Sequence, residues 1–232
     1  MLLSKVTVLG LRWGWGFVGV YRMFRIVLAD DHLIVRRGLR ALLETRPDFV
    51  VCAEAGDGRE AVDLVLQHKP DVAVLDISLP LLNGVEATRH IRKGSPDTEI
   101  LVFTMHDGDE LIREALHAGA RGYLLKSEGD EQIINAVAAL ARHRPFFSAQ
   151  ASETLLDSFS NGSGVQASVL TTREREIVQL IAEGNSNKAI ARLLDISVKT
   201  VETHRSTAMR KLGMHSSAEL VRYAVRNKLI QP

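Results

Sequence analysis

The sequence is almost without cysteine, since Cys52 is the one thiol among 232 residues. An intrachain disulfide is therefore excluded, and a reducing compartment fits this composition. Cys52 stands in an apolar run, so we expect it to pack inside a sheet.

The sequence also lacks an apolar run long enough to cross a membrane. The nearest candidate, residues 6–20, is interrupted by Arg12 and falls short of the roughly 20 apolar residues that a spanning helix needs. No small-residue cleavage site follows it, which argues against a secretory signal. We therefore expect a cytoplasmic protein without a membrane partner. Residues 1–22 are expected to be an N-terminal extension that is disordered or precedes the native start at Met23.

Net charge is nearly absent, at +1, but the two halves of the chain differ in sign. Residues 24–147 hold 15 Lys and Arg against 20 Asp and Glu, whereas residues 165–232 hold 11 against 6. An acidic half joined to a basic half indicates that only the second half meets a polyanion.

Short apolar runs alternate with helical patterns through the first two thirds of the chain. The runs predict strands at 24–29, 49–53, 71–76, 99–104 and 122–125. Helical spacing follows at 33–43, near 58–68, from Gly84, at 109–117 and at 130–142. Five strands alternating with helices predict an α/β domain, a doubly wound parallel sheet of order 2-1-3-4-5 with helices on both faces.

No strand signal remains after Val169. Helices are expected from Thr171 or Thr172 to Gly184, then near 187–194, 198–212 and 216–227, and the second and third form a helix-turn-helix pattern. Residues 148–167 have linker composition around Asn161-Gly162-Ser163-Gly164, although 148–159 can form a short helix. The predicted organisation is therefore an α/β domain at 23–147, a linker at 148–167 and an all-α, four-helix domain at 168–232.

Polar residues of suitable chemistry stand at the carboxyl ends of the predicted strands: Asp30, Asp31, Asp76, Thr104 and Lys126. Because these strand ends share one edge of the sheet, the side chains are expected to converge in one crevice. Converging carboxylates repel unless a cation joins them, and their hard oxygen atoms suit Mg²⁺. The lysine and the threonine would bind the oxygens of a phosphoryl group on Asp76.

Residues 24–147 resemble a response-regulator receiver domain. The matching segments are IVLADDH at 26–32, LDISLP at 75–80 with Asn83-Gly84, LVFT at 101–104 and GYLLK at 122–126. This resemblance implies that Asp76 accepts phosphate from a sensor histidine kinase.

The same resemblance implies a Mg²⁺ site and a conformational switch. The implied metal ligands are Asp31, Asp76, the backbone carbonyl of Ser78 and, through water, Asp30. Thr104 and Tyr123 would form the switch, in which the hydroxyl moves toward phosphate and the ring turns inward. His32 and His106 lie near this edge but lack a partnered ligand spacing, so a histidine metal site is not expected.

Residues 168–230 resemble a LuxR-type DNA-binding domain. The matching segments are LTTRERE at 170–176, GNSNKAIA at 184–191, ISVKTVETH at 196–204 and KL at 211–212. Together the two resemblances indicate the NarL/FixJ class of response regulators. Ala208 and Ala189 depart from the usual pattern, where a larger apolar residue and an acid are more common, and neither alters the expected fold.

A recognition helix enters the major groove with its N-terminal part, and the third helix has this position. Base contacts are expected from Glu202, Thr203 and Ser206. Glu202 suits a cytosine amino group, because a carboxylate cannot hold phosphate. Phosphate contacts are expected from Lys188, Lys199, Thr200, His204, Arg205 and Lys211. In this family the fourth helix, 216–227, forms the dimer contact on double-stranded promoter DNA.

The expected function is a two-component transcription regulator rather than an enzyme. One alternative is an atypical DNA-binding regulator that works without phosphate, although the complete acidic pocket argues against it. Another is an aspartyl-phosphate phosphotransferase, but enzymes of the haloacid-dehalogenase type carry a second acid where Ser78 stands. A quorum-sensing function, suggested by the helical half alone, lacks an apolar ligand domain.

Overall fold

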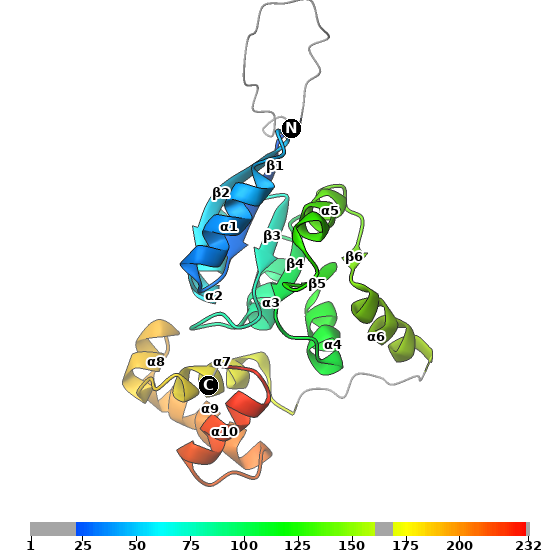
Figure 1. The fold of residues 1–232 in the computed structure, drawn as a ribbon. Helices are drawn as coiled ribbons and strands as arrows, with labels where there is room; N and C mark the ends of the chain where they lie inside the picture. The colour runs from blue at the N-terminus through cyan, green and yellow to red at the C-terminus, as the bar shows by residue number, and fades with distance from the viewer. Residues whose placement is uncertain (1–21, 161–168, 231–232) are drawn as a thin grey trace, which may run out of the picture.

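The computed structural model describes residues 22–160 and 169–230, a parallel sheet followed by a helical domain (Figure 1). The strands are β1 (Phe24–Ala29), β2 (Phe49–Ala55), β3 (Val72–Leu75), β4 (Glu99–Thr104), β5 (Gly122–Leu125) and β6 (Phe146–Phe147). They lie in the order β2-β1-β3-β4-β5-β6, which confirms the predicted order of the first five. The sixth has two residues and was not predicted, because so short a strand leaves no alternation to detect. The N-terminal extension up to residue 21 and residues 161–168 of the expected linker lie outside the described residues.

Helices cover both faces of the sheet. They are α1 (Leu33–Leu43), α2 (Gly58–His68), α3 (Gly84–Gly94), α4 (Asp109–Ala118) and α5 (Asp130–Leu140). Side chains alternate along a strand, so Ile26 and Leu28 pack with α1 and α5, whereas Val27 and Ala29 pack with α2, α3 and α4. A further helix, α6 (Ala149–Ser160), follows β6 and occupies the first part of the predicted linker, where the sequence allowed a short helix.

Four helices with their own core form the second domain. They are α7 (Thr172–Ala182), α8 (Asn187–Leu193), α9 (Val198–Lys211) and α10 (Ser217–Arg226). Thr171 and Glu174 form a capping box at the start of α7, and Ser197 caps α9. Gly184 follows α7 with a φ of +87°, a backbone conformation that glycine adopts without strain.

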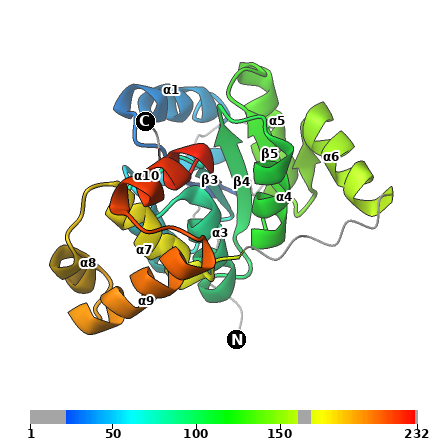
Figure 2. The ribbon, with the colours of Figure 1, turned by 90° about the horizontal axis from the view of Figure 1, so that it is seen from below.

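The two domains contact each other through α7, which lies against α3 and the loop after β3 (Figure 2). Nε2 of His90 on α3 lies 2.7 Å from Oε1 of Glu176, and Oε1 of Glu86 lies 2.6 Å from Nε of Arg175. The contact between domains is therefore largely polar. Among the described residues, no helix combines the length and the apolar character needed to span a bilayer.

Two glycine substitutions should test the packing of the first domain. A Cβ at Gly58, the first residue of α2, would clash with the backbone carbonyl of Leu82, so Gly58→Ala should lower the free energy of unfolding by about 1–3 kcal/mol. A Cβ at Gly38, inside α1, meets nothing within 4 Å, so Gly38→Ala should raise it by about 0.5–1 kcal/mol. Urea unfolding followed by circular dichroism measures both. A Gly58→Ala chain as stable as wild type would contradict the close contact between α2 and that loop.

Candidate functional site

The carboxyl ends of β1 and β3 bring two acidic side chains together. Ala29 pairs with Leu75 between these neighbouring strands, so Asp30 and Asp76, which follow them, lie side by side. The two residues are only 2% and 4% exposed. Two buried carboxylates this close need a cation to offset their repulsion and desolvation.

Lys126, directly after β5, supplies that cation. Its Nζ lies 2.6 Å from Oδ2 of Asp30 and 2.9 Å from Oδ2 of Asp76, and it donates a hydrogen bond to each. Burial lowers the pKa of the Lys126 ammonium, but the charges and hydrogen bonds of the two carboxylates outweigh burial, and its pKa is raised. Lys126 therefore stays protonated and holds the two aspartates in one geometry.

Asp31 and His32 border this pair on its exposed side. Nδ1 of His32 lies 2.7 Å from Oδ1 of Asp31, and ligand atoms of Asp30, Asp31 and His32 all lie within 4.8 Å of one another. Carboxylate oxygens with access to water fit a hard cation such as Mg²⁺, which keeps several of its waters. The sequence spacing does not predict a histidine ligand. His32 nevertheless lies beside the ligand atoms of Asp30 and Asp31, because it directly follows Asp31.

The other two predicted metal ligands are placed differently. Asp76 is linked to Asp30 through Lys126, and its Oδ1 accepts a hydrogen bond from the backbone N–H of Ile77 at 2.7 Å. Ser78 is buried, and its Oγ lies 2.8 Å from Nε2 of His106. Its backbone carbonyl remains a predicted ligand.

Thr104 and Tyr123, the predicted switch residues, are both fully buried. The Tyr123 hydroxyl donates a hydrogen bond to the backbone carbonyl of His106 at 2.7 Å, and Thr104 Oγ1 accepts one from the backbone N–H of His106 at 3.3 Å. Burial, followed by the charges of Asp107 and Asp76, raises the pKa of Tyr123. The ring is thus turned inward, and His106 connects both switch residues to Ser78.

The predicted DNA-contact residues lie on α8 and α9. Lys188 and the α9 residues Lys199, Glu202, Thr203 and Ser206 are exposed, whereas Thr200 and His204 are half-buried. The other two basic residues, half-buried Arg205 and exposed Lys211, are bonded to groups of their own domain. Arg205 donates to Ser217 Oγ at 2.7 Å, and Lys211 Nζ donates to Glu174 Oε2 at 2.7 Å.

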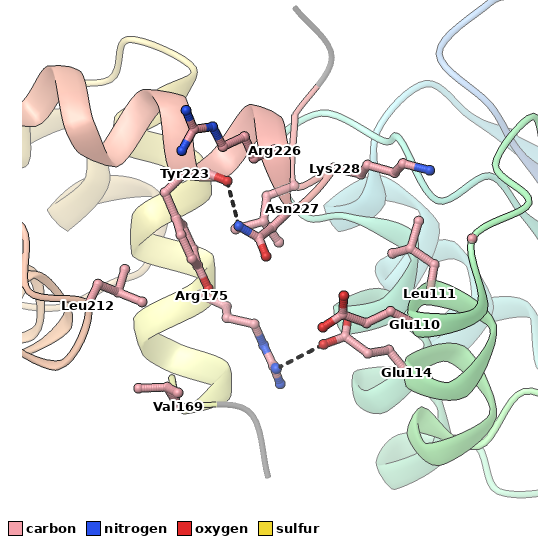
Figure 3. A pocket seen from close by; sticks show the side chains of 12 residues that line it. Glu110, Leu111, Glu114, Val169, Arg175, Leu212, Tyr223, Arg226, Asn227 and Lys228 are labelled. Atoms are coloured by element: carbon pink, nitrogen blue, oxygen red, sulfur yellow. Dashed lines mark hydrogen bonds and ion pairs between the residues drawn. The ribbon is translucent and has the colours of Figure 1, made fainter. Parts of the chain in front are cut away.

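A cavity of about 350 Å³ lies between α4 and the helical domain (Figure 3). Glu110 and Glu114 line it from α4, and Arg175, Tyr223 and Lys228 line it from the other side. Nη1 of Arg175 lies 3.8 Å from Oε1 of Glu114, so acidic and basic groups face each other across the cavity. These opposite charges attract the two domains to each other. They do not form the surface of one charge sign that a charged ligand would need.

Two polar residues that face the first domain, Gln179 on α7 and its C-cap Glu183, were not predicted as functional. Gln179 is fully buried, and Glu183 accepts a hydrogen bond from the backbone N–H of Leu81. In the sequence, each is a polar residue beside the apolar face of a short helix. Most surface helices have such residues, so this pattern does not indicate a contact between domains.

Two protein families match this chain, one in each domain. The family described as response regulator receiver domain matches residues 26–138, and the luxR family of bacterial regulatory proteins matches residues 168–224. The oxygen regulatory protein NreC of Staphylococcus carnosus is 42% identical over 214 residues, covering 89% of this chain and 99% of that protein.

Solved structures of other proteins are also similar to this chain. A LuxR-family two-component response regulator from Aurantimonas sp. SI85-9A1 has a TM-score of 0.56 and 40% identity, covering 60% of this chain and 99% of that one. A structure of two RcsB dimers bound to two parallel DNAs has a TM-score of 0.54 and 27% identity, covering 87% of this chain and 97% of that one.

Removal of the central cation should destabilise the first domain. Lys126→Met removes the lysine cation that two buried carboxylates share, so the free energy of unfolding should fall by about 3 kcal/mol at neutral pH. Millimolar Mg²⁺ should recover part of this loss. In wild type, the raised pKa makes the contribution of Lys126 complete below its ordinary pKa and lost as pH rises through the folded-state value.

Urea titrations with and without Mg²⁺ measure these differences. Lys93→Met, which removes an exposed lysine of α3, is the matched control and should change stability by less than about 0.5 kcal/mol. Equal losses in the two variants would contradict the role assigned to Lys126.

Proposed function

We propose that Asp76 is the phosphoacceptor of this chain, which belongs to the two-component response regulators that join a receiver domain to a LuxR-type DNA-binding domain. The chain is a response regulator of the NarL type. The proposed donor is the phosphohistidine of a sensor histidine kinase. The observation that carries the proposal is the buried contact of Lys126 with Asp30 and Asp76, since it presents one carboxylate beside a fixed positive charge.

The transfer step needs little from the protein beyond position and charge. An oxygen of the Asp76 carboxylate attacks phosphorus, and the bond from phosphorus to the kinase histidine breaks. The imidazole nitrogen leaves with the electron pair of the broken bond, and a carboxylate nucleophile has no proton to release in this step. Lys126 offsets charge on the phosphoryl oxygens, and the Thr104 hydroxyl can donate to one of them.

The acidic residues fit a resident Mg²⁺ ion, which would be held by Asp31, Asp76, the Ser78 carbonyl and, through water, Asp30. When bound, it would neutralise negative charge on the phosphoryl group. The chain's own residues define the site without it. Asp30 and Lys126 orient Asp76, and burial of Thr104 and Tyr123 keeps bulk water away from the inner side.

The proposed output is sequence-specific binding to promoter DNA by two copies of the chain. The N-terminal part of α9 presents Glu202, Thr203 and Ser206, all exposed, at the position from which a recognition helix reads the major groove. RcsB, a similar protein, binds DNA as dimers, and α10 is the proposed contact between copies here. The cytoplasm, where a kinase and chromosomal DNA are both present, is the compartment that this function requires.

Phosphorylation should occur at one residue. Incubation with acetyl phosphate and Mg²⁺ should add the mass of one phosphoryl group, and peptide mapping should place it on Asp76. Asp76→Asn should abolish the addition, whereas Asp97→Asn, at an exposed acid before β4, should leave it intact. Unchanged phosphorylation of the Asp76→Asn chain, or steady turnover of a generic phosphate ester by wild type, would contradict the proposal.

Two α9 substitutions should affect DNA binding in different ways. Lys199→Ala should weaken binding to all duplexes alike and reduce the slope of log affinity against log salt by about 1, because one phosphate contact is lost. Glu202→Ala should leave the salt slope unchanged and cost about 1–3 kcal/mol of discrimination at one base pair.

Fluorescence anisotropy with a duplex selected from a random library measures both effects. Arg37→Ala, at an exposed residue of the receiver helix α1, is the control. An equal loss of affinity in all three variants would contradict the assignment of α9 as the recognition helix.

A further inference from the structure

One histidine lies at the acidic edge of the sheet and has no part in the proposed transfer step. Nδ1 of His32 lies 2.7 Å from Oδ1 of Asp31 and 3.5 Å from Oδ1 of Asp30. One ligand atom from each of these three residues lies within 4.8 Å of the other two. A ring nitrogen is therefore placed among the carboxylate oxygens of the expected metal site.

The start of α1 does not account for a histidine at this position. His32 is the N-cap residue of α1 and has an extended backbone, yet its side chain makes no capping hydrogen bond. Serine, threonine, aspartate and asparagine are the residues that cap helices through their side chains. The helix uses only the backbone carbonyl of His32, which accepts from the N–H of Arg36 at 3.1 Å. The imidazole contacts the carboxylates instead.

The acid beside His32 is held in place from several directions. The backbone N–H of His32 donates to Oδ1 of Asp30 at 2.8 Å, and Nζ of Lys126 donates to Oδ2 at 2.6 Å. Nη1 of Arg36 donates to the backbone carbonyl of Asp30. The three ligand residues are consecutive, so these bonds fix the backbone that carries all of them. A ligand set arranged in advance loses little freedom when an ion binds.

The ring nitrogen is also open to solvent. The side chain of His32 is 58% exposed and that of Asp31 is 28% exposed, so an ion can enter from this side. The other histidine at this edge, His106, has its Nε2 2.8 Å from Oγ of Ser78. Within the described part of the chain, His32 is the histidine that joins the acidic ligand group.

The donor atoms of a site decide which ion it prefers. Mg²⁺ takes oxygen ligands and keeps several waters, so a neighbouring nitrogen adds little to its binding. Divalent ions later in the first transition series, from Fe²⁺ to Zn²⁺, bind imidazole well and bind mixed nitrogen and oxygen sites more tightly than Mn²⁺ does. Two carboxylates with one imidazole therefore suit a transition-metal ion.

We propose that Nδ1 of His32 is a metal ligand beside the phosphoacceptor, and that it gives the site a preference for a divalent transition-metal ion over Mg²⁺. This inference rests on the proposed function, because it extends the metal site beside Asp76. Both kinds of ion use the carboxylate oxygens, and only the transition-metal ion uses the nitrogen as well. His32 thus determines metal specificity without taking part in the phosphoryl transfer.

Metal titration of the full-length chain tests this role, with Co²⁺ and Mg²⁺ alone as the probes. His32→Asn removes the ring nitrogen and leaves a residue that caps helices well, so the chain should fold as wild type does. Its Co²⁺ affinity should fall about tenfold or more, because loss of a group that only orients a ligand already costs that much. Its Mg²⁺ affinity should stay within about twofold of the wild-type value, because Mg²⁺ uses oxygen ligands.

Isothermal titration calorimetry measures both affinities. His117→Asn, at an exposed histidine of α4, is the matched control and should bind both ions as wild type does. Asp31→Asn should weaken both ions, because it removes an oxygen ligand that they share. Proton NMR with one equivalent of Co²⁺ gives a direct signature, since a coordinated imidazole shows strongly shifted signals that His32→Asn should lack.

The outcomes separate this inference from the proposed function. Equal Co²⁺ affinity in wild type and His32→Asn, or shifted imidazole signals that persist in that variant, overturns the role of His32. Phosphorylation of Asp76 by acetyl phosphate with Mg²⁺ would still support the proposed function. Absence of phosphate on Asp76 in wild type overturns the proposed function, whereas a selective loss of Co²⁺ affinity in His32→Asn still supports His32 as a ligand.

Discussion

The contact of one lysine with two buried aspartates is the interaction on which the receiver depends. Lys126 lies between the buried side chains of Asp30 and Asp76, and their charges and hydrogen bonds raise its pKa although burial alone would lower it. The sheet brings Asp30, Asp76 and Lys126 together, because each of them directly follows a different parallel strand. Lys126 thereby fixes the orientation of the Asp76 carboxylate, which the proposed phosphoryl transfer requires.

The loop of residues 77–83 connects Asp76 to the helical domain. It begins at the residue after Asp76, contains the expected ligand Ser78 and ends where Asn83 caps α3. Gln179 and Glu183 bind the same loop through its backbone groups. These seven residues therefore lie between Asp76 and the helical domain and contact both.

The fold and the main site residues could be predicted because their signals are local. Apolar runs such as Val72–Leu75 mark buried strands, and the polar residue that follows each strand must lie at the same edge of a parallel sheet. The meeting of Asp30, Asp76 and Lys126 follows from that rule. The strand order follows from right-handed crossovers, and the four C-terminal helices follow from their apolar spacing. The strand β6 was missed because two residues, Phe146 and Phe147, show no period.

The sequence by itself determined two domains, one with an acidic edge and one with a helix-turn-helix pattern and a basic charge balance, since periodicity and strand ends specify both. Only the tertiary structure decided that Tyr123 is turned inward, that His32 lies among the acidic ligand atoms and that α7 binds the loop of residues 77–83. The physical reason is that the identity of a polar residue such as Gln179 does not indicate which distant group it will bind. Its hydrogen bonds go to backbone groups about a hundred residues away, and every residue has such groups.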